Sequence, residues 1–161
     1  MAKTALQFRH NGREVAVFVD GGGNLLNALR EGVGDVSVKF GCGQGGCGAC
    51  TVLIDGEAHL SCLTLAETVE GRSVETADGL KTGPELHPLQ KAFMDSFAAQ
   101  CGYCTPGMLM AAKALIDRNP SPSKQEVVEA ISGNICRCTG YEPIISAILS
   151  VAAAGGGAKR A

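Results

Sequence analysis

The chain has 161 residues, which is room for one domain or two very small ones. Apolar residues make up 45% of it, charged residues 19%, and the formal net charge is −2. This composition excludes a disordered chain, and without a basic excess it gives no electrostatic basis for binding nucleic acid. The sequence contains no run of about 18 apolar residues, the length that a membrane span needs. Charged residues near the start interrupt the apolar core that a secretory signal requires, so we expect a cytoplasmic protein.

The first half of the chain is predicted to form a small mixed sheet with one helix packed against it. Asn11-Gly12 and Asp55-Gly56 are the turn pairs typical of hairpins, and Asn24 is expected to cap a short leucine-rich helix. Alternation of apolar residues and turn signals predict strands at 4–9, 14–19, 51–54 and 73–76. Between the helix and the third strand, residues 36–40 lead into a glycine-rich loop.

The second half reads as helical. A helix is expected from Pro88 to Gln100, with Phe93 and Phe97 on one buried stripe, and a second begins at Thr105 as its N-cap. Two further helices are expected, one from a capping box at 123–126 through residue 131 and one at about 143–153. The predicted division is a domain at 1–78, a linker at 79–87, a domain at 88–154 and a flexible tail at 155–161.

Eight cysteines fall into two sets of four, separated by 38 residues without cysteine. The first set reads C-x4-C-x2-C-x11-C and the second C-x2-C-x31-C-x-C. The sets are Cys42, Cys47, Cys50 and Cys62, and Cys101, Cys104, Cys136 and Cys138. Disulfides need an oxidising compartment, which the absence of an export signal disfavours, so metal binding is the better interpretation.

The first set favours an iron–sulfur cluster over zinc. A zinc ribbon usually offers two similar C-x2-C pairs, whereas C-x4-C-x2-C with a distant fourth cysteine is the spacing of plant-type [2Fe–2S] proteins. Five glycines at 41–48 would let the backbone come close, and its amides would offset the negative charge of thiolates and sulfides. Because β-branched Thr51-Val52 follows, the G-x-G-x-x-G at 41–46 is not read as a dinucleotide site.

The second set depends more on its context. Two antiparallel helices would bring residues 101–104 beside 136–138, with a helix N-terminus directed at the centre, and the helix dipole favours an anionic cluster there. Spacing alone leaves zinc open for this set. His10 and His87 are expected to be ordinary surface residues, and with every cysteine committed as a ligand we expect no catalytic residue on this chain.

Three motifs carry a resemblance to a known family: GCGQGGCGACTV at 41–52, QCGYCTPGM at 100–108 and GNICRCTGY at 133–141. With them the chain resembles the small iron–sulfur subunit of the molybdenum hydroxylases, the group of xanthine dehydrogenase, aldehyde oxidase and carbon monoxide dehydrogenase. The resemblance implies an α+β protein, with a β-grasp, plant-ferredoxin-like domain followed by a four-helix domain. It also implies a [2Fe–2S] cluster in each, and so iron rather than zinc at the second set.

The function implied by the resemblance is electron transfer within an oxidoreductase complex. Electrons would leave a molybdopterin centre on a large subunit, pass through two [2Fe–2S] clusters here and reach an acceptor, usually FAD on a medium subunit; a dimer of heterotrimers is the expected assembly. Gln100 and Cys138 match positions that approach the pterin, although Gln100 could merely cap the end of the helix at 88–99. A free-standing ferredoxin-like carrier and a zinc-binding interaction module remain as alternatives.

Overall fold

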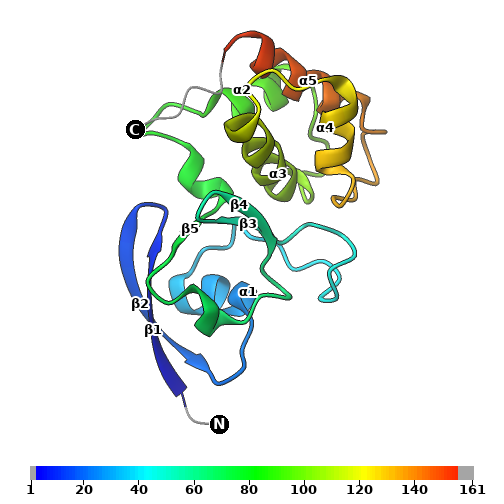
Figure 1. Cartoon of the computed structure of the whole chain (residues 1–161). Coiled ribbons are helices and arrows are strands. Elements are labelled where there is room, and N and C mark those ends of the chain that lie inside the picture. Colours follow the sequence, from blue (N-terminus) through cyan, green and yellow to red (C-terminus); the bar gives the residue numbers. More distant parts are fainter. Residues whose placement is uncertain (1–2, 156–161) are drawn as a thin grey trace.

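Two hydrophobic cores organise the chain, one between a sheet and a helix and the other among four helices. The computed structural model describes residues 3–155. In Figure 1 the strands and α1 form the lower half, and the helices α2 to α5 form the upper half. This is the α+β arrangement expected, with a sheet half followed by a helical half.

The sheet contains five strands in the order β2-β1-β5-β3-β4. Its strands are β1 (Lys3–His10), β2 (Arg13–Asp20), β3 (Thr51–Ile54), β4 (Glu57–Leu60) and β5 (Ser73–Glu75). The β1–β5 pair is parallel and the other pairs are antiparallel, so the sheet is mixed, as predicted. At the β1–β2 turn Asn11 and Gly12 both have positive φ (49° and 79°), the conformation that a tight two-residue hairpin requires.

One helical segment packs against the sheet. It begins as α1 (Leu25–Asn27) and continues as a π-helix at Ala28–Val33. The side chain of Asn24 caps it by accepting a hydrogen bond from the Asn27 N–H at 2.9 Å. Leu25, Leu26 and Leu29 are fully buried, which confirms the predicted capped and leucine-rich helix. Two short 3-10 turns, Ala66–Val69 and Ala77–Leu80, complete this half.

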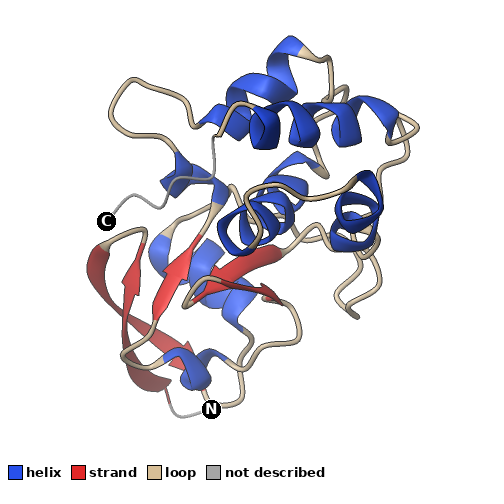
Figure 2. Cartoon of the chain, turned by 45° about the horizontal axis from the view of Figure 1, so that its top comes forward, coloured by secondary structure: helices blue, strands red, loops and turns tan. Residues whose placement is uncertain are grey.

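The helical half consists of α2 (Pro88–Asp95), α3 (Thr105–Arg118), α4 (Lys124–Ile131) and α5 (Glu142–Ala153), seen in blue in Figure 2. The capping box of α4 is present, because Ser123 and Glu126 bond reciprocally. At α3 the N-cap is Cys104 rather than Thr105, which is already helical. No helix within residues 3–155 is long and apolar enough to cross a membrane. The tail predicted at 155–161 lies outside the described residues beyond Gly155.

The first helix of this half is shorter than predicted. It ends at Asp95, because Phe97 adopts a φ of 52° and the Ala98 N–H bonds the Phe93 carbonyl at 2.9 Å. Together with the bond from the Phe97 N–H to the Met94 carbonyl, this is a Schellman motif with a phenylalanine in the place that glycine usually takes. Phe93 is therefore buried, whereas Phe97 is 84% exposed, and the prediction of a common buried stripe is wrong.

Strand β3 joins the two cores. Val52 and Ile54 belong to the core of the sheet half, while Leu53 between them belongs to the helical core. Successive side chains of a strand point to opposite faces, so β3 is covered on both sides, and α3 packs over it. The two halves of the chain are consequently in direct contact rather than merely linked.

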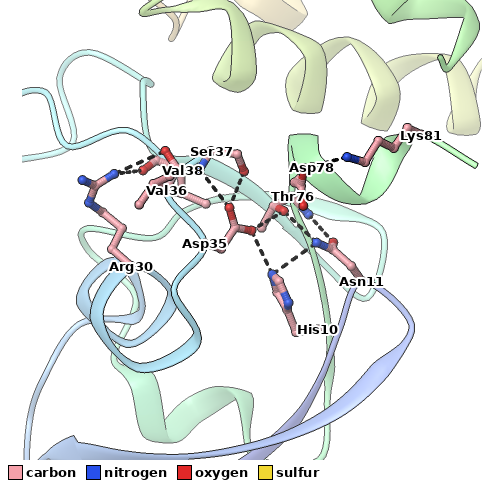
Figure 3. Close-up of polar contacts among 10 residues, drawn as sticks. All are labelled: His10, Asn11, Arg30, Asp35, Val36, Ser37, Val38, Thr76, Asp78 and Lys81. Carbon is pink, nitrogen blue, oxygen red and sulfur yellow. Dashed lines mark hydrogen bonds and ion pairs between the residues drawn. The ribbon is translucent and has the colours of Figure 1, made fainter. Parts of the chain in front are cut away.

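A buried carboxylate, Asp35, joins the segment that leads into the glycine-rich loop to residues of the sheet half by hydrogen bonds (Figure 3). It accepts hydrogen bonds from His10 Nε2 at 2.9 Å and Thr76 Oγ1 at 2.6 Å, and from the N–H and hydroxyl of Ser37 at 2.9 and 2.6 Å. Asn11 joins the network by bonding Thr76. His10 is thus part of a buried polar network, and its prediction as an ordinary surface residue is wrong.

The network keeps Asp35 ionised. Burial raises the pKa of this carboxyl, but the hydrogen bonds from His10, Ser37 and Thr76 outweigh burial and hold its pKa well below the ordinary value. Because the pKa is lower in the folded chain, the stabilisation is complete above the unfolded-state pKa of about 3.9 and is lost as the pH falls toward the folded-state value. Asp35 therefore stabilises the fold at neutral pH.

We expect Asp35→Asn to lower the free energy of unfolding at pH 7 by about 1–3 kcal/mol, because it confronts buried donors with an amide N–H. Urea unfolding of the metal-loaded chain measures this change. Asp20→Asn is the matched control, since Asp20 is exposed at the end of β2 and its replacement should stay within about 0.5 kcal/mol. Equal effects of the two substitutions would contradict the role given to the network.

Candidate metal centres

The β3–β4 hairpin brings together two cysteines of the first set. Cys50 directly precedes β3 and Cys62 follows β4, and the register pairs Thr51 with Leu60. Beyond the last pair, Ser61 donates to the Cys50 carbonyl from its N–H at 3.3 Å and from its hydroxyl at 2.8 Å. Both thiols are buried, and burial, followed by contact with Cys50, raises the pKa of Cys62 to about 11.

The other two thiols of the first set lie in the glycine-rich loop. The N–H groups of Gln44 and Gly46 donate to Cys42 Sγ at 3.5 and 3.3 Å, as the sequence predicted for amides in this loop. The Gln44 N–H and then the Cys47 thiol lower the pKa of Cys42 to about 7. The turn that aims these amides at the sulfur requires positive φ at Gly43 (68°), which glycine adopts without strain.

The second set lies where α3 begins and where the segment after α4 returns. Cys101 and Cys138 bring their sulfur atoms within 3.6 Å of each other, and both side chains are exposed. Cys104 is the N-cap of α3, so the positive end of the helix dipole faces this site, as predicted. Burial, followed by contact with Cys136, raises the pKa of Cys104 to about 12.

Cys136 is the inner thiol of the second set. Its sulfur accepts from the Thr139 N–H at 3.5 Å and lies 3.2 Å from the Thr139 hydroxyl. Burial raises the pKa of Cys136, but the contacts with Thr139, together with those from the Cys138 N–H and the Cys104 thiol, outweigh burial and lower it overall. Tyr141 holds the loop, because its hydroxyl bridges the Cys136 N–H at 2.9 Å and the Asn134 carbonyl at 3.3 Å.

The thiols of each set contact one another in pairs. The pairs are Cys42 with Cys47, Cys50 with Cys62, Cys104 with Cys136, and Cys101 with Cys138. Within residues 3–155, no three Cys, His, Asp or Glu side chains converge as ligands of one metal ion. Two pairs of thiolates per site suit a two-iron cluster, which takes four cysteine ligands in all. Donor type, pairing and sulfur-directed amides therefore fit a [2Fe–2S] cluster at each set.

The backbones of the two sites touch. The Ile135 N–H donates to the Cys47 carbonyl at 2.9 Å, and the Tyr103 hydroxyl donates to the Phe40 carbonyl. Asn134, which is buried, donates to the Gly48 carbonyl at 2.9 Å and to Thr51 Oγ1 at 3.2 Å. Sequence reasoning missed these links, since an asparagine inside a cysteine motif carries no signal of what it contacts 86 positions away.

Comparisons with known proteins agree with this geometry. A family model described as "2Fe-2S iron-sulfur cluster binding domain" matches residues 8–79, and one described as "[2Fe-2S] binding domain" matches residues 76–149. The nicotine 6-hydroxylase small subunit of Paenarthrobacter nicotinovorans is 52% identical over 86% of this chain and 84% of its own length. The nicotinate dehydrogenase small FeS subunit of Eubacterium barkeri is 42% identical over 92% of this chain and 94% of its own length.

Longer proteins and solved structures match as well. Aldehyde oxidoreductase of Megalodesulfovibrio gigas is 42% identical over 92% of this chain, which there corresponds to 17% of the protein. A chain of quinoline 2-oxidoreductase from Pseudomonas putida 86 superposes with a TM-score of 0.94 at 46% identity, covering 99% of this chain and all of that one. The same two-domain unit thus occurs both as a separate chain and as part of a longer one.

Two [2Fe–2S]-binding domains in contact define an iron–sulfur electron-transfer protein. The chain belongs to the family of small iron–sulfur subunits of the molybdenum hydroxylases, and its role is that of the electron-transfer subunit of an oxidoreductase. Its relatives act as subunits of larger enzymes or are fused to the rest of the enzyme.

We expect Gly41→Ala to reduce iron at the first set. A Cβ at this position would lie 2.7 Å from Cys47 Sγ, so the thiol would have to leave its place. Gly46→Ala is the matched control, because a Cβ there meets nothing within 4 Å and its φ is not positive. Iron content and the EPR signals of the reduced protein measure the effect. Equal iron loss in both variants, or in neither, would contradict this role of Gly41.

Proposed function

We propose that each set of four cysteines binds one [2Fe–2S] cluster, and that the two clusters relay electrons between a molybdopterin centre and FAD on partner subunits. The support is the donor set itself, four thiols in two contacting pairs at each site, with amides directed at sulfur. When bound, each cluster supplies one-electron transfer. The chain's own part is to hold the thiolates, limit solvent access and set the separation of the sites.

The exposure of the thiols supports an order of the two sites. Cys101 and Cys138 are exposed, and so is Gln100 beside them, whereas Cys136 on the inner side is buried next to the contact with the first site. The second site thus has one edge open to a partner and one edge toward the first site. This arrangement supports entry of electrons from the molybdopterin at residues 101–138 and exit from residues 42–62.

Gln100 and Cys138 are the residues we propose to face the pterin. Gln100 lies five positions beyond the end of α2, where Ser96 and Phe97 already close the helix, so it does not cap that helix. Its exposed amide can both donate and accept hydrogen bonds, and it adds no charge near an anionic cluster. Cys138 would combine two roles, as a cluster ligand and as the thiol at the exposed edge.

Partner subunits are part of the proposal. Large apolar side chains next to the cysteines are half or more exposed, namely Phe40, Leu63, Tyr103 and Ile135. Apolar surface of this kind around a redox site is suited to burial against other chains. We infer a large molybdopterin-binding subunit, a medium FAD-binding subunit and a dimer of such heterotrimers, in the cytoplasm. A free-standing carrier is the alternative, and it would purify without partners.

The protein should carry four iron and four acid-labile sulfide per chain, in two spectroscopically distinct clusters, because two complete ligand sets lie in different surroundings.

Cys47→Ser should remove or damage the first cluster and abolish steady-state turnover. Substrate should still reduce the remaining cluster in a single turnover. The reciprocal variant Cys104→Ser should block reduction of the first cluster by substrate. Zinc in place of iron would refute the proposal, and undiminished turnover of Cys47→Ser would refute the order.

Gln100→Ala tests the pterin-facing edge. We expect normal iron content and slower reduction of the second cluster by substrate, measured by stopped-flow spectroscopy on the assembled complex. Gln125→Ala is the control, since Gln125 is an exposed amide on α4 that donates to Glu129 of the same helix. Reduction rates that are the same in both variants would show that Gln100 makes no functional contact.

A further inference from the structure

Asn134 lies in a slot between two glycines from different halves of the chain. It is 4% exposed, and its amide donates to the Gly48 carbonyl at 2.9 Å and to Thr51 Oγ1 at 3.2 Å. A Cβ on Gly48 would lie 2.6 Å from Asn134 Nδ2 and 2.4 Å from the Gly133 carbonyl. A Cβ on Gly107 would lie 3.0 Å from the same Nδ2 and 2.3 Å from the Gly48 carbonyl.

The slot lies directly beside a backbone hydrogen bond that joins the two thiol sites. Ile135 N–H donates to the Cys47 carbonyl at 2.9 Å. Cys47 belongs to the first set, and Cys136 of the second set follows Ile135 in the chain. Asn134 precedes the donor Ile135 in the chain, and its side-chain amide donates to the carbonyl of Gly48, the residue after Cys47. Two adjacent hydrogen bonds therefore join the Asn134–Ile135 segment to the Cys47–Gly48 segment.

We propose that Asn134 is a positioning residue that sets the rate of electron transfer between the two sites, by holding the Cys47–Gly48 backbone against the Ile135 N–H. This inference rests on the cysteine ligands of the proposed function. With a cluster bound at each set, transfer of one electron would oxidise the cluster at residues 101–138 and reduce the cluster at residues 42–62, and no bond would form or break. Electron transfer depends on the Ile135–Cys47 hydrogen bond, because Cys47 of the first set accepts it and Cys136 of the second set directly follows its donor.

Thr51 is a second residue that holds the Gly48 carbonyl. Its hydroxyl donates to the Gly48 carbonyl at 2.7 Å while it accepts from Asn134. The Tyr103–Phe40 bond joins the halves elsewhere, so the loss of Asn134 alone leaves the halves in contact through it and through the packing of α3 on β3. A change in the link between the sites can therefore be produced without separating the two halves.

The test is Asn134→Leu in the assembled complex. Leucine keeps the branched shape but places a methyl where an N–H now donates, so the Gly48 carbonyl must move away. Iron content and the two cluster potentials should be unchanged. The magnetic interaction between the reduced clusters in EPR should weaken, and arrival of the electron at the first cluster in a single turnover should slow severalfold. Asn119→Leu is the control, since the side chain of Asn119 bonds Glu126 and Ser121, both in the helical half, and its replacement should change neither readout.

If Asn134→Leu loses a cluster, Thr51→Val and Thr51→Ser carry the test. The valine variant removes the hydroxyl at constant shape and should slow intercluster transfer, while the serine variant retains the hydroxyl and should preserve it. Fully loaded variants with unchanged magnetic interaction and unchanged transfer would overturn the inference while leaving the ligand assignment intact. Absence of two clusters from the unaltered protein would refute the proposed function itself.

Discussion

The burial of β3 on both faces is the constraint on which the rest of the structure depends. One side of the strand contributes Val52 and Ile54 to the core under the sheet, and the other contributes Leu53 to the helical core. Cys50 directly precedes this strand, so the loop that carries the first thiol set is attached to both cores at once. Hydrophobic packing therefore places the two thiol sites relative to each other, and polar contacts act on their separation at short range.

Glycine residues and hydrogen bonds then shape the loops that carry the thiols. Gly48 combines a φ of 68° with backbone of the other half packed where a side chain would be, so two independent requirements exclude other residues at this position. Amides of the 41–46 loop and the Thr139 N–H reach sulfur at both sites. The Asp35 network anchors the segment before the loop at its other end, through strand β1 and Thr76. Each thiol loop is thus supported by contacts formed outside it.

Local signals in the sequence were sufficient for most of the fold. Asn11-Gly12, Asn24 and the Ser123–Glu126 box all have the predicted structure, because turns and caps depend on residues a few positions apart. The end of α2 was missed, since the stripe that continues to Phe97 favours a longer helix, whereas the chain turns at Phe97 with a φ of 52° and buries Ala98 instead. His10 and Asn134 were missed for a related reason: their partners, Asp35 and Gly48, lie 25 and 86 positions away.

The unequal acidities of the thiols bear on how the protein acquires its metal. Burial raises the pKa of the Cys62 and Cys104 thiols, whereas the Gln44 N–H lowers the pKa of Cys42. Iron must displace the protons of the buried thiols, since only the thiolate is a ligand. Cofactor insertion is accordingly a proton-releasing reaction, which mild acid opposes.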